Sequence, residues 1–155
     1  MRQEPSVRYP GAEIGELIQD QKEVDGPLAE LFRRLDEIIA TNIEQRSDLS
    51  ASVENTYPTY PRVALQELIR NAVIHRNYEA TTSPVMLSWY ADRVEITSPG
   101  GPCGMVTQET FGQPGLTDAR NPALASAAKS MRFVQRFGSG IPRAQAALRP
   151  QPPCP

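Results

Sequence analysis

The sequence predicts an α+β domain in which helices pack on one face of an antiparallel or mixed sheet. Two segments repeat their apolar residues with the period of a helix, and a later segment alternates with the period of a strand. The resulting order is helix, helix, hairpin, glycine-rich loop, helix, glycine-rich loop, helix, which is typical of α+β domains. A chain of 155 residues suits one such domain with a sizeable core.

The first helix is expected to begin at Pro27, because proline favours the first helical position and Asp25-Gly26 precedes it as a cap. Its apolar side chains recur at helical spacing and predict one continuous core face: Leu28, Leu31, Phe32, Leu35, Ile38, Ile39 and Ile43. Upstream, residues 7–9 are a short strand candidate. Downstream, residues 45–61 are polar and are expected to form a loop.

A second helix is expected over residues 62–75, followed by a hairpin. The hairpin strands are expected over residues 85–90 and 93–97. Residues 98–104 are rich in glycine, and a mobile segment is expected after them up to about residue 119. Asn121-Pro122 predicts the start of a helix over 122–131, and Gly138-Ser139-Gly140 predicts the start of the last helix.

Composition and charge exclude some classes of protein. No apolar run approaches the ~20 residues that a membrane-spanning helix needs, so we expect no membrane partner and a cytoplasmic location. The net charge is −2, but residues 119–155 hold six of the sixteen basic residues and no acidic one. This basic segment is suited to phosphate, either of a nucleotide or of nucleic acid, but scattered solvated arginines would give the same count.

Three polar residues, Glu67, Asn71 and His75, form a stripe along the second helix because they are four residues apart. An amide oxygen can ligate Mg²⁺, and a carboxylate one turn away can orient or deprotonate a water molecule. Polar residues at this spacing are also common on a solvated helix face. The glycine turns that follow favour the functional interpretation, because backbone N–H groups at a helix start attract phosphate oxygens.

Four segments in this order resemble the divergent GHKL-type (histidine-kinase-like) ATPase domain of predicted bacterial and archaeal transcriptional regulators. They begin with the Glu67–Tyr78 segment and the Asp92–Gly101 segment, and continue with Arg120-Asn121-Pro122 and the Arg136–Ile141 segment. In that family a Schlafen/AlbA-type DNA-binding domain usually comes first, and some relatives are labelled RecG-like helicases. The resemblance covers roughly residues 5–149.

The resemblance implies a two-layer α/β sandwich of the GHKL (Bergerat) type, with a nucleotide, ATP together with Mg²⁺, between a mixed sheet and a layer of helices. Glu67 would be the catalytic residue that orients water, and Asn71 would be the magnesium ligand. The cofactor-binding residues implied in the two glycine segments are Ser98, Gly100, Gly101, Gly138, Ser139 and Gly140. Residues of about 105–137 would form a lid.

The sequence departs from the family at Ser98, where active members carry an aspartate that accepts a hydrogen bond from the adenine amino group. Serine is uncharged, and bonds to ionised groups are typically stronger. The chain is therefore expected to be an ATP-binding domain with weak or no hydrolysis.

The expected organisation is a remnant of a preceding domain or a linker over 1–26, the GHKL-like domain over 27–149, and a disordered tail over 150–155. Two other functions stay open. One is a degenerate interaction or dimerisation module that forms a homodimer, in a regulator whose DNA is bound by a separate domain. The other is direct nucleic-acid binding through residues 120–149.

Overall fold

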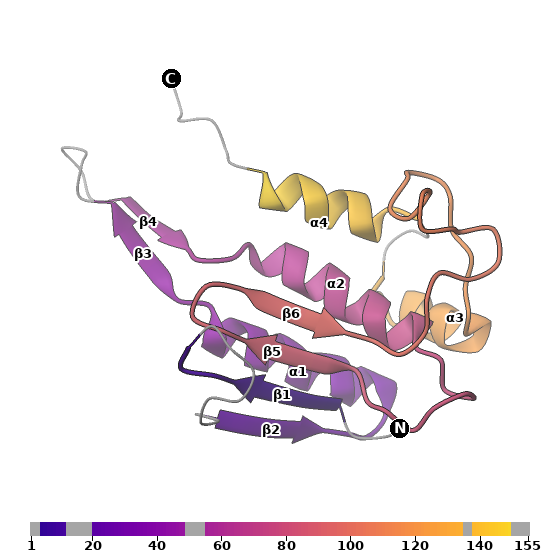
Figure 1. The fold of residues 1–155 in the computed structure, drawn as a ribbon, viewed down its shortest axis with the longest axis horizontal. Helices are drawn as coiled ribbons and strands as arrows, with labels where there is room; N and C mark the ends of the chain where they lie inside the picture. Colours follow the sequence, from indigo (N-terminus) through magenta and orange to yellow (C-terminus); the bar gives the residue numbers. More distant parts are fainter. Residues whose placement is uncertain (1–3, 12–19, 49–54, 135–137, 150–155) are drawn as a thin grey trace.

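The computed structural model describes residues 4–11, 20–48, 55–134 and 138–149. Its elements, in chain order, are β1 (Glu4–Arg8), β2 (Asp20–Val24), α1 (Leu28–Asn42), β3 (Gln45–Asp48), β4 (Asn55–Pro58), α2 (Arg62–His75), β5 (Met86–Trp89), β6 (Val94–Thr97), α3 (Pro122–Ser130) and α4 (Gly140–Leu148). Figure 1 shows their arrangement.

Four strands form one mixed sheet in the order β2-β1-β5-β6. β1 pairs in parallel with β5, with Val7 opposite Ser88, and the other neighbours pair antiparallel. β1 and β2 both precede residue 27, and they belong to the same sheet as the β5–β6 hairpin. The predicted α+β class is confirmed, and the mixed sheet with its four helices is consistent with a GHKL-type sandwich.

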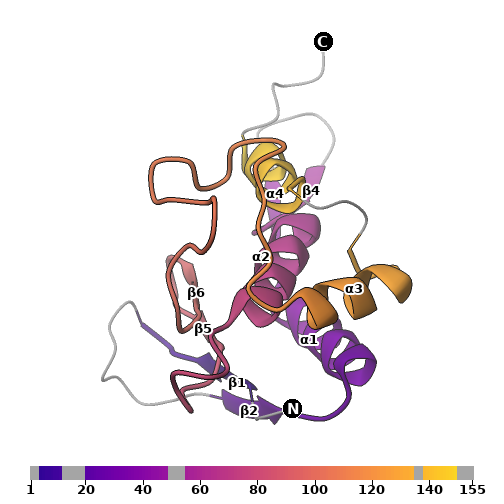
Figure 2. The ribbon, with the colours of Figure 1, turned by 90° about the vertical axis from the view of Figure 1, so that its right-hand side faces the viewer.

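The helices lie on one side of the sheet, so the domain has two layers (Figure 2). α1 and α2 pack against each other and against the sheet, because the apolar stripe of α1 needs a partner surface. Every residue of the stripe predicted for α1 is buried except Ile43, which is partly buried and packs against the same core. Ile69 and Val73 of α2 and Leu87 of β5 complete the centre of this core.

Three strands were not expected from the sequence. The predicted loop over 45–61 is wrong in part, because β3 and β4 pair antiparallel as a separate two-stranded sheet, with Gln45 opposite Pro58. β2 was also missed, because four of its five residues are exposed and polar or charged, and Val24 alone is buried. An edge strand of this kind carries no apolar alternation to reveal it.

The helices around the predicted site begin close to their expected positions. α2 spans the predicted residues 62–75, α3 begins at Pro122 and α4 at Gly140. α4 lies along α2, so the face of α2 that carries the polar stripe is covered by another helix (Figure 1). The predicted tail over 150–155 lies outside the described residues, as does part of the predicted lid at 135–137.

No helix in the described part of the chain is both long and apolar enough to cross a membrane.

Candidate nucleotide-binding site

The polar stripe of α2 lies at an interface between helices. Glu67 is 7% exposed, while Asn71 and His75 are half-buried. A solvated helix face would leave all three open to water, so that interpretation of the stripe does not hold for Glu67. The covering element is α4, which packs more extensively on α2 than any other element does.

An ion pair fixes α4 on this stripe. Arg143, in the first turn of α4, donates to a carboxylate oxygen of Glu67 at 2.7 Å. The carboxylate side is almost fully enclosed, whereas the guanidinium side is 42% exposed. Glu67 therefore has a cationic partner in this conformation and is not open to water as a free base would be.

Gly140 allows the close contact between the two helices. A Cβ atom on this residue would lie 2.7 Å from the Asn71 amide nitrogen and 3.1 Å from a Glu67 carboxylate oxygen. The first of these distances is shorter than real Cβ contacts allow, so a side chain at Gly140 would force the Asn71 amide or α4 to shift. The sequence thus brings the start of α4 directly onto the two polar residues of α2.

Beside this contact lies an open cavity of about 670 Å³, lined mainly by α2, β6, the segment between β6 and α3, and the start of α4. This volume is in the range of ordinary small-molecule sites. Six of the predicted site residues line it: Asn71, Ser98, Gly100, Gly101, Gly138 and Gly140. The two others, Glu67 and Ser139, are not among its lining residues, although Ser139 is the N-cap of α4.

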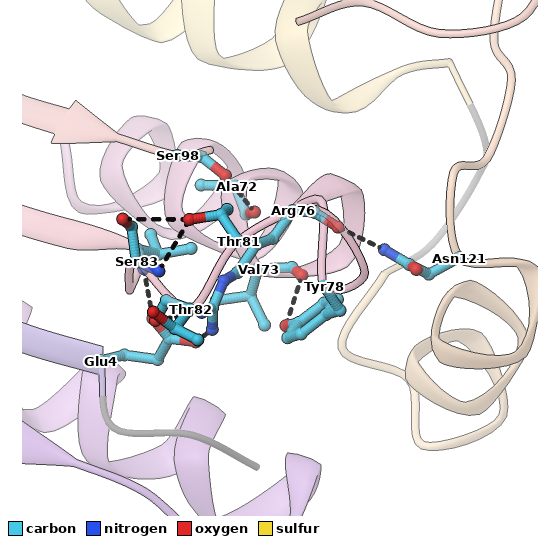
Figure 3. A network of polar contacts seen from close by, with 11 residues as sticks. Glu4, Ala72, Val73, Arg76, Tyr78, Thr81, Thr82, Ser83, Ser98 and Asn121 are labelled. Atoms are coloured by element: carbon cyan, nitrogen blue, oxygen red, sulfur yellow. Dashed lines mark hydrogen bonds and ion pairs between the residues drawn. The ribbon is translucent and has the colours of Figure 1, made fainter. Parts of the chain in front are cut away.

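Ser98 binds the end of α2. Its hydroxyl donates to the carbonyl oxygen of Ala72 at 2.9 Å (Figure 3). The last four carbonyls of a helix lack partners within the helix. Two further side chains satisfy neighbouring carbonyls: Tyr78 donates to Val73 at 2.9 Å, and Asn121 donates to Ile74 at 2.7 Å.

Asn121 therefore acts on α2, although the sequence predicts it as the cap of α3. It occupies the N-cap position of α3, but its side chain makes no capping hydrogen bond there. The amide also donates to the carbonyl of Arg76 at 2.7 Å. The start of α3 is thus fixed to the end of α2.

The glycine-rich loop after β6 is held from two sides. Gly100 has φ +104, a conformation that favours glycine, and a Cβ atom there would lie 3.0 Å from that of Asn77. Arg120 donates to the carbonyl of Gly101 at 2.8 Å, and Asn77 donates its backbone N–H to Pro99 at 2.8 Å. This loop is a fixed wall of the cavity.

Behind this wall, a buried ion pair ties the end of α2 to β1. Arg76 donates to Glu4 at 2.8 Å, and both side chains are almost fully buried. Glu4 also accepts from the backbone N–H of Val85, and Arg76 donates to the carbonyl of Thr82 at 3.2 Å (Figure 3). Burial raises the pKa of Glu4, against the lowering effects of the Val85 N–H and Arg76. Burial of the Tyr78 hydroxyl, together with the nearby charge of Glu4, raises the pKa of Tyr78 to about 12.

His75 lines the cavity one turn beyond Asn71. Burial lowers its pKa, the charge of Arg120 lowers it further, and Asp118 acts in the opposite direction. The imidazole is therefore neutral at pH 7, when it can both accept and donate a hydrogen bond.

Two residues of the site carry no motif in the sequence: Asp118, which lines the cavity, and Arg143, which pairs with Glu67. Arg120, which holds the glycine loop, belongs to the Arg120-Asn121-Pro122 segment of the family resemblance, but the sequence predicted no role for it. No spacing rule connects them to α2. The C-terminal segment is basic, but its charge alone cannot assign an arginine to a particular partner.

The donor set for a metal is small. In the residues that the structure describes, no group of three or more His, Cys, Asp or Glu side chains could hold a metal ion. Magnesium in nucleotide sites usually keeps several waters and is held by one or two protein ligands together with the phosphates. Asn71, on the cavity wall beside the start of α4, fits that limited role.

Comparison with solved structures places the fold among known ones. The structure is similar to the crystal structure of the DIP2311 protein from Corynebacterium diphtheriae, with a TM-score of 0.82 over 95% of this chain and 22% sequence identity. The matched part is 30% of that protein's chain, so this chain spans less than a third of its length.

Comparison with protein families points to an ATPase-type domain. Residues 82–153, a little under half of the chain, match the family model described as "Putative ATP-dependent DNA helicase recG C-terminal". The match includes Ser98 and the glycines of both loops, whereas Glu67 and Asn71 precede it. No curated protein matches the sequence.

Proposed function

We propose that this domain binds ATP together with Mg²⁺ and hydrolyses it weakly or not at all. The observation that carries the proposal is the contact of Gly140 with Asn71 and Glu67 at the edge of a 670 Å³ cavity. It brings a helix start, a magnesium-type ligand and a carboxylate to one place. The match of residues 82–153 to an ATPase-type family supports the same function.

The phosphates would lie at the start of α4. Gly140 and Ile141 line the cavity and belong to the first turn of a nine-residue helix. The first N–H groups of a helix have no partner within it, and the helix dipole favours negative charge at this end. Asn71, opposite Gly140, would contribute its amide oxygen to the magnesium ion, which supplies charge neutralisation for the phosphates when bound.

Ser98 would contact the base as a hydrogen-bond acceptor. A hydroxyl has one hydrogen, and that of Ser98 is used by the Ala72 carbonyl. The oxygen keeps its acceptor capacity and can receive a hydrogen bond from an amino group. A neutral acceptor makes a weaker bond than the usual aspartate, so we expect modest affinity.

Weak hydrolysis follows from the pairing of Glu67. A general base must reach the attacking water and accept its proton. The Glu67 carboxylate is instead bound by Arg143 at 2.7 Å, and Glu67 does not line the cavity. In this conformation, the residue that would activate water is engaged elsewhere.

The proposal is tested by calorimetric titration with ATP, with and without Mg²⁺. Binding that requires Mg²⁺ and is lost in Asn71→Ala is the expected result. Gln66→Ala is the matched control, because it removes an amide from the same helix at a position outside the cavity. Absence of heat from folded protein, or equal binding by Asn71→Ala, would refute the assigned site.

We further propose that the domain belongs to a cytoplasmic bacterial regulator in which a separate domain binds DNA. The resemblance to regulator ATPase domains supports this assignment. A DNA-binding assay on this domain alone should then show no affinity, whereas salt-dependent binding would favour the basic segment after residue 119 as a direct contact.

A second candidate function is a module that binds a partner or a second copy of itself. Met105 and Phe111, on the segment that borders the cavity, are 72% and 58% exposed. Large apolar side chains in such positions are common at interaction surfaces. Light scattering distinguishes the two: a monomer that binds Mg-ATP supports the first function, and a dimer without nucleotide affinity supports the second.

A further inference from the structure

Asp118 is the single carboxylate among the described residues that line the cavity. It lies on the segment between β6 and α3, two residues before Arg120. No sequence motif singled it out. The polar groups that line the same cavity are otherwise uncharged or, like His75, neutral at pH 7.

The backbone opposite Asp118 is shaped to receive its carboxylate. The N–H of Met105 donates to one carboxylate oxygen, Oδ2, at 3.2 Å. Gly104 has φ +58, and a Cβ atom there would lie 1.8 Å from the same oxygen. A residue other than glycine at this position would displace the carboxylate, so Gly104 allows Asp118 to occupy the cavity wall.

The second oxygen of Asp118 has no hydrogen-bond or ion-pair partner among residues 4–11, 20–48, 55–134 and 138–149. The nearby arginine, Arg120, is engaged with the carbonyl of Gly101. A carboxylate that keeps one oxygen available in a cavity is an acceptor for a ligand N–H group, and charge makes such a bond strong.

Asp118 lies near His75 at the end of α2, and its neighbour Thr117 lies beside Gly138 in the turn before α4. The charge of Asp118 acts on His75, which lies about 6 Å along the helix axis from Asn71 at 1.5 Å per residue. Gly140, by contrast, contacts Asn71 and Glu67. A negative charge close to the phosphates would oppose binding, whereas one near the base would not.

We propose that Asp118 determines the specificity of the site by accepting a hydrogen bond from the exocyclic amino group of the base. This inference rests on the proposed nucleotide-binding function. It assigns to the segment before α3 the charged acceptor that the loop at Ser98 lacks. The site would therefore select a base with an amino group over one without it.

The test compares Mg-ATP with Mg-purine riboside triphosphate, which differs from ATP by a hydrogen in place of the amino group. We expect the parent protein to bind ATP about 10- to 100-fold more tightly, as the loss of a charged hydrogen bond implies. Asp118→Asn should reduce this ratio, and Asp118→Ala should reduce it further, to the smaller preference that the neutral acceptor Ser98 supports. Asp92→Asn, which alters an exposed carboxylate outside the cavity, should leave the ratio unchanged.

The ratio of the affinities for ATP and for purine riboside triphosphate separates a loss of specificity from structural damage. A collapse of the loop would weaken the binding of both nucleotides equally and leave the ratio unchanged. An unchanged ratio in both Asp118 variants, with ATP still bound, overturns the inference and leaves the proposed function standing. An equal gain in affinity for both nucleotides also overturns it, since Asp118 would then repel phosphate. A parent protein that binds neither nucleotide overturns the proposed function and the inference together.

Discussion

Arg143 holds the Glu67 carboxylate at 2.7 Å and thereby couples the first turn of α4 to the middle of α2. The contact joins the two segments that the sequence singled out independently, the polar stripe of one helix and the glycine turn before another. It also gives the low hydrolysis proposed here a physical cause that a single substitution can remove.

Arg143→Gln should release Glu67 and raise the rate of ATP hydrolysis. A general base contributes about 10²–10⁴-fold, so partial release predicts a kcat increase of about tenfold, with little change in KM. Phosphate release at saturating Mg-ATP measures this. Arg143→Lys keeps the cation and should stay slow.

The double variant Arg143→Gln/Glu67→Gln is the decisive control for that prediction. It should return to the parent rate, because the released carboxylate is then absent. Equal rates in the parent and in Arg143→Gln would show that the ion pair does not restrain Glu67. Because the Glu67 carboxylate is only 9% exposed, loss of its cationic partner should cost more than loss of an exposed pair, roughly 1–3 kcal/mol of unfolding free energy.

Gly140→Ala should impair both nucleotide binding and stability. The new methyl group would lie 2.7 Å from the Asn71 amide nitrogen, so that amide or α4 must shift, and overpacking of this kind costs about 1–3 kcal/mol. Gly101→Ala is the matched control, since that glycine also lines the cavity but has nothing within 4 Å of its Cβ position. Urea unfolding and ATP titration of both variants measure the effect. Normal behaviour of Gly140→Ala would mean that the close approach is not required.

The sequence was sufficient for the elements with strong periodicity. The apolar steps of α1 and the extent of α2 could be predicted because each helix has an apolar face that must be buried. β2 could not be predicted, since an exposed edge strand of mostly charged residues has no apolar alternation. β3 and β4 also lack apolar alternation. Their pairing depends on contacts between two separate segments, which the pattern within either segment does not show.

The site was predictable only in part, for a related reason. Asn71 and the glycines Gly100, Gly101, Gly138 and Gly140 could be named from motifs and do line one cavity. The residues that contact these side chains and define the chemistry of the site could not be named from motifs. That Ser98 binds the Ala72 carbonyl, and that Arg143 binds Glu67, depends on how helices pack in three dimensions. Local spacing carries no record of such contacts.

Glu4→Ala should destabilise the fold strongly by leaving Arg76 buried without its partner. Breaking a buried pair by removing one side typically costs about 3–5 kcal/mol. Glu44→Ala, which breaks the exposed pair with Arg8, should cost no more than about 1 kcal/mol. The ion pair broken by Glu4→Ala is buried and the one broken by Glu44→Ala is exposed, and urea unfolding compares the free energies of unfolding of the two variants. Similar small losses in both would show that water reaches Arg76 when Glu4 is removed.

Ser98→Ala should lower the unfolding free energy by about 1 kcal/mol, the net value of an ordinary hydrogen bond, because the Ala72 carbonyl loses its donor. Ser98→Thr keeps a hydroxyl and should lose less. Thermal unfolding gives the stability, and ATP titration reports whether the same oxygen contacts the base. A stable Ser98→Ala protein with unchanged ATP affinity would remove Ser98 from the site.

His75 should give the protein a pH-dependent stability near neutrality. Burial lowers its pKa in the folded chain below the ordinary value of about 6.5, so the unfolded chain binds the proton more readily. The contribution of His75 is therefore fully present above about pH 6.5 and is lost as the pH falls through its lowered folded pKa.

The chain has one histidine, so its imidazole NMR resonances report this pKa directly. Thermal unfolding of His75→Asn should show a flatter pH dependence over the same range. A folded-state pKa at or above 6.5 would contradict the burial of the ring at the cavity wall.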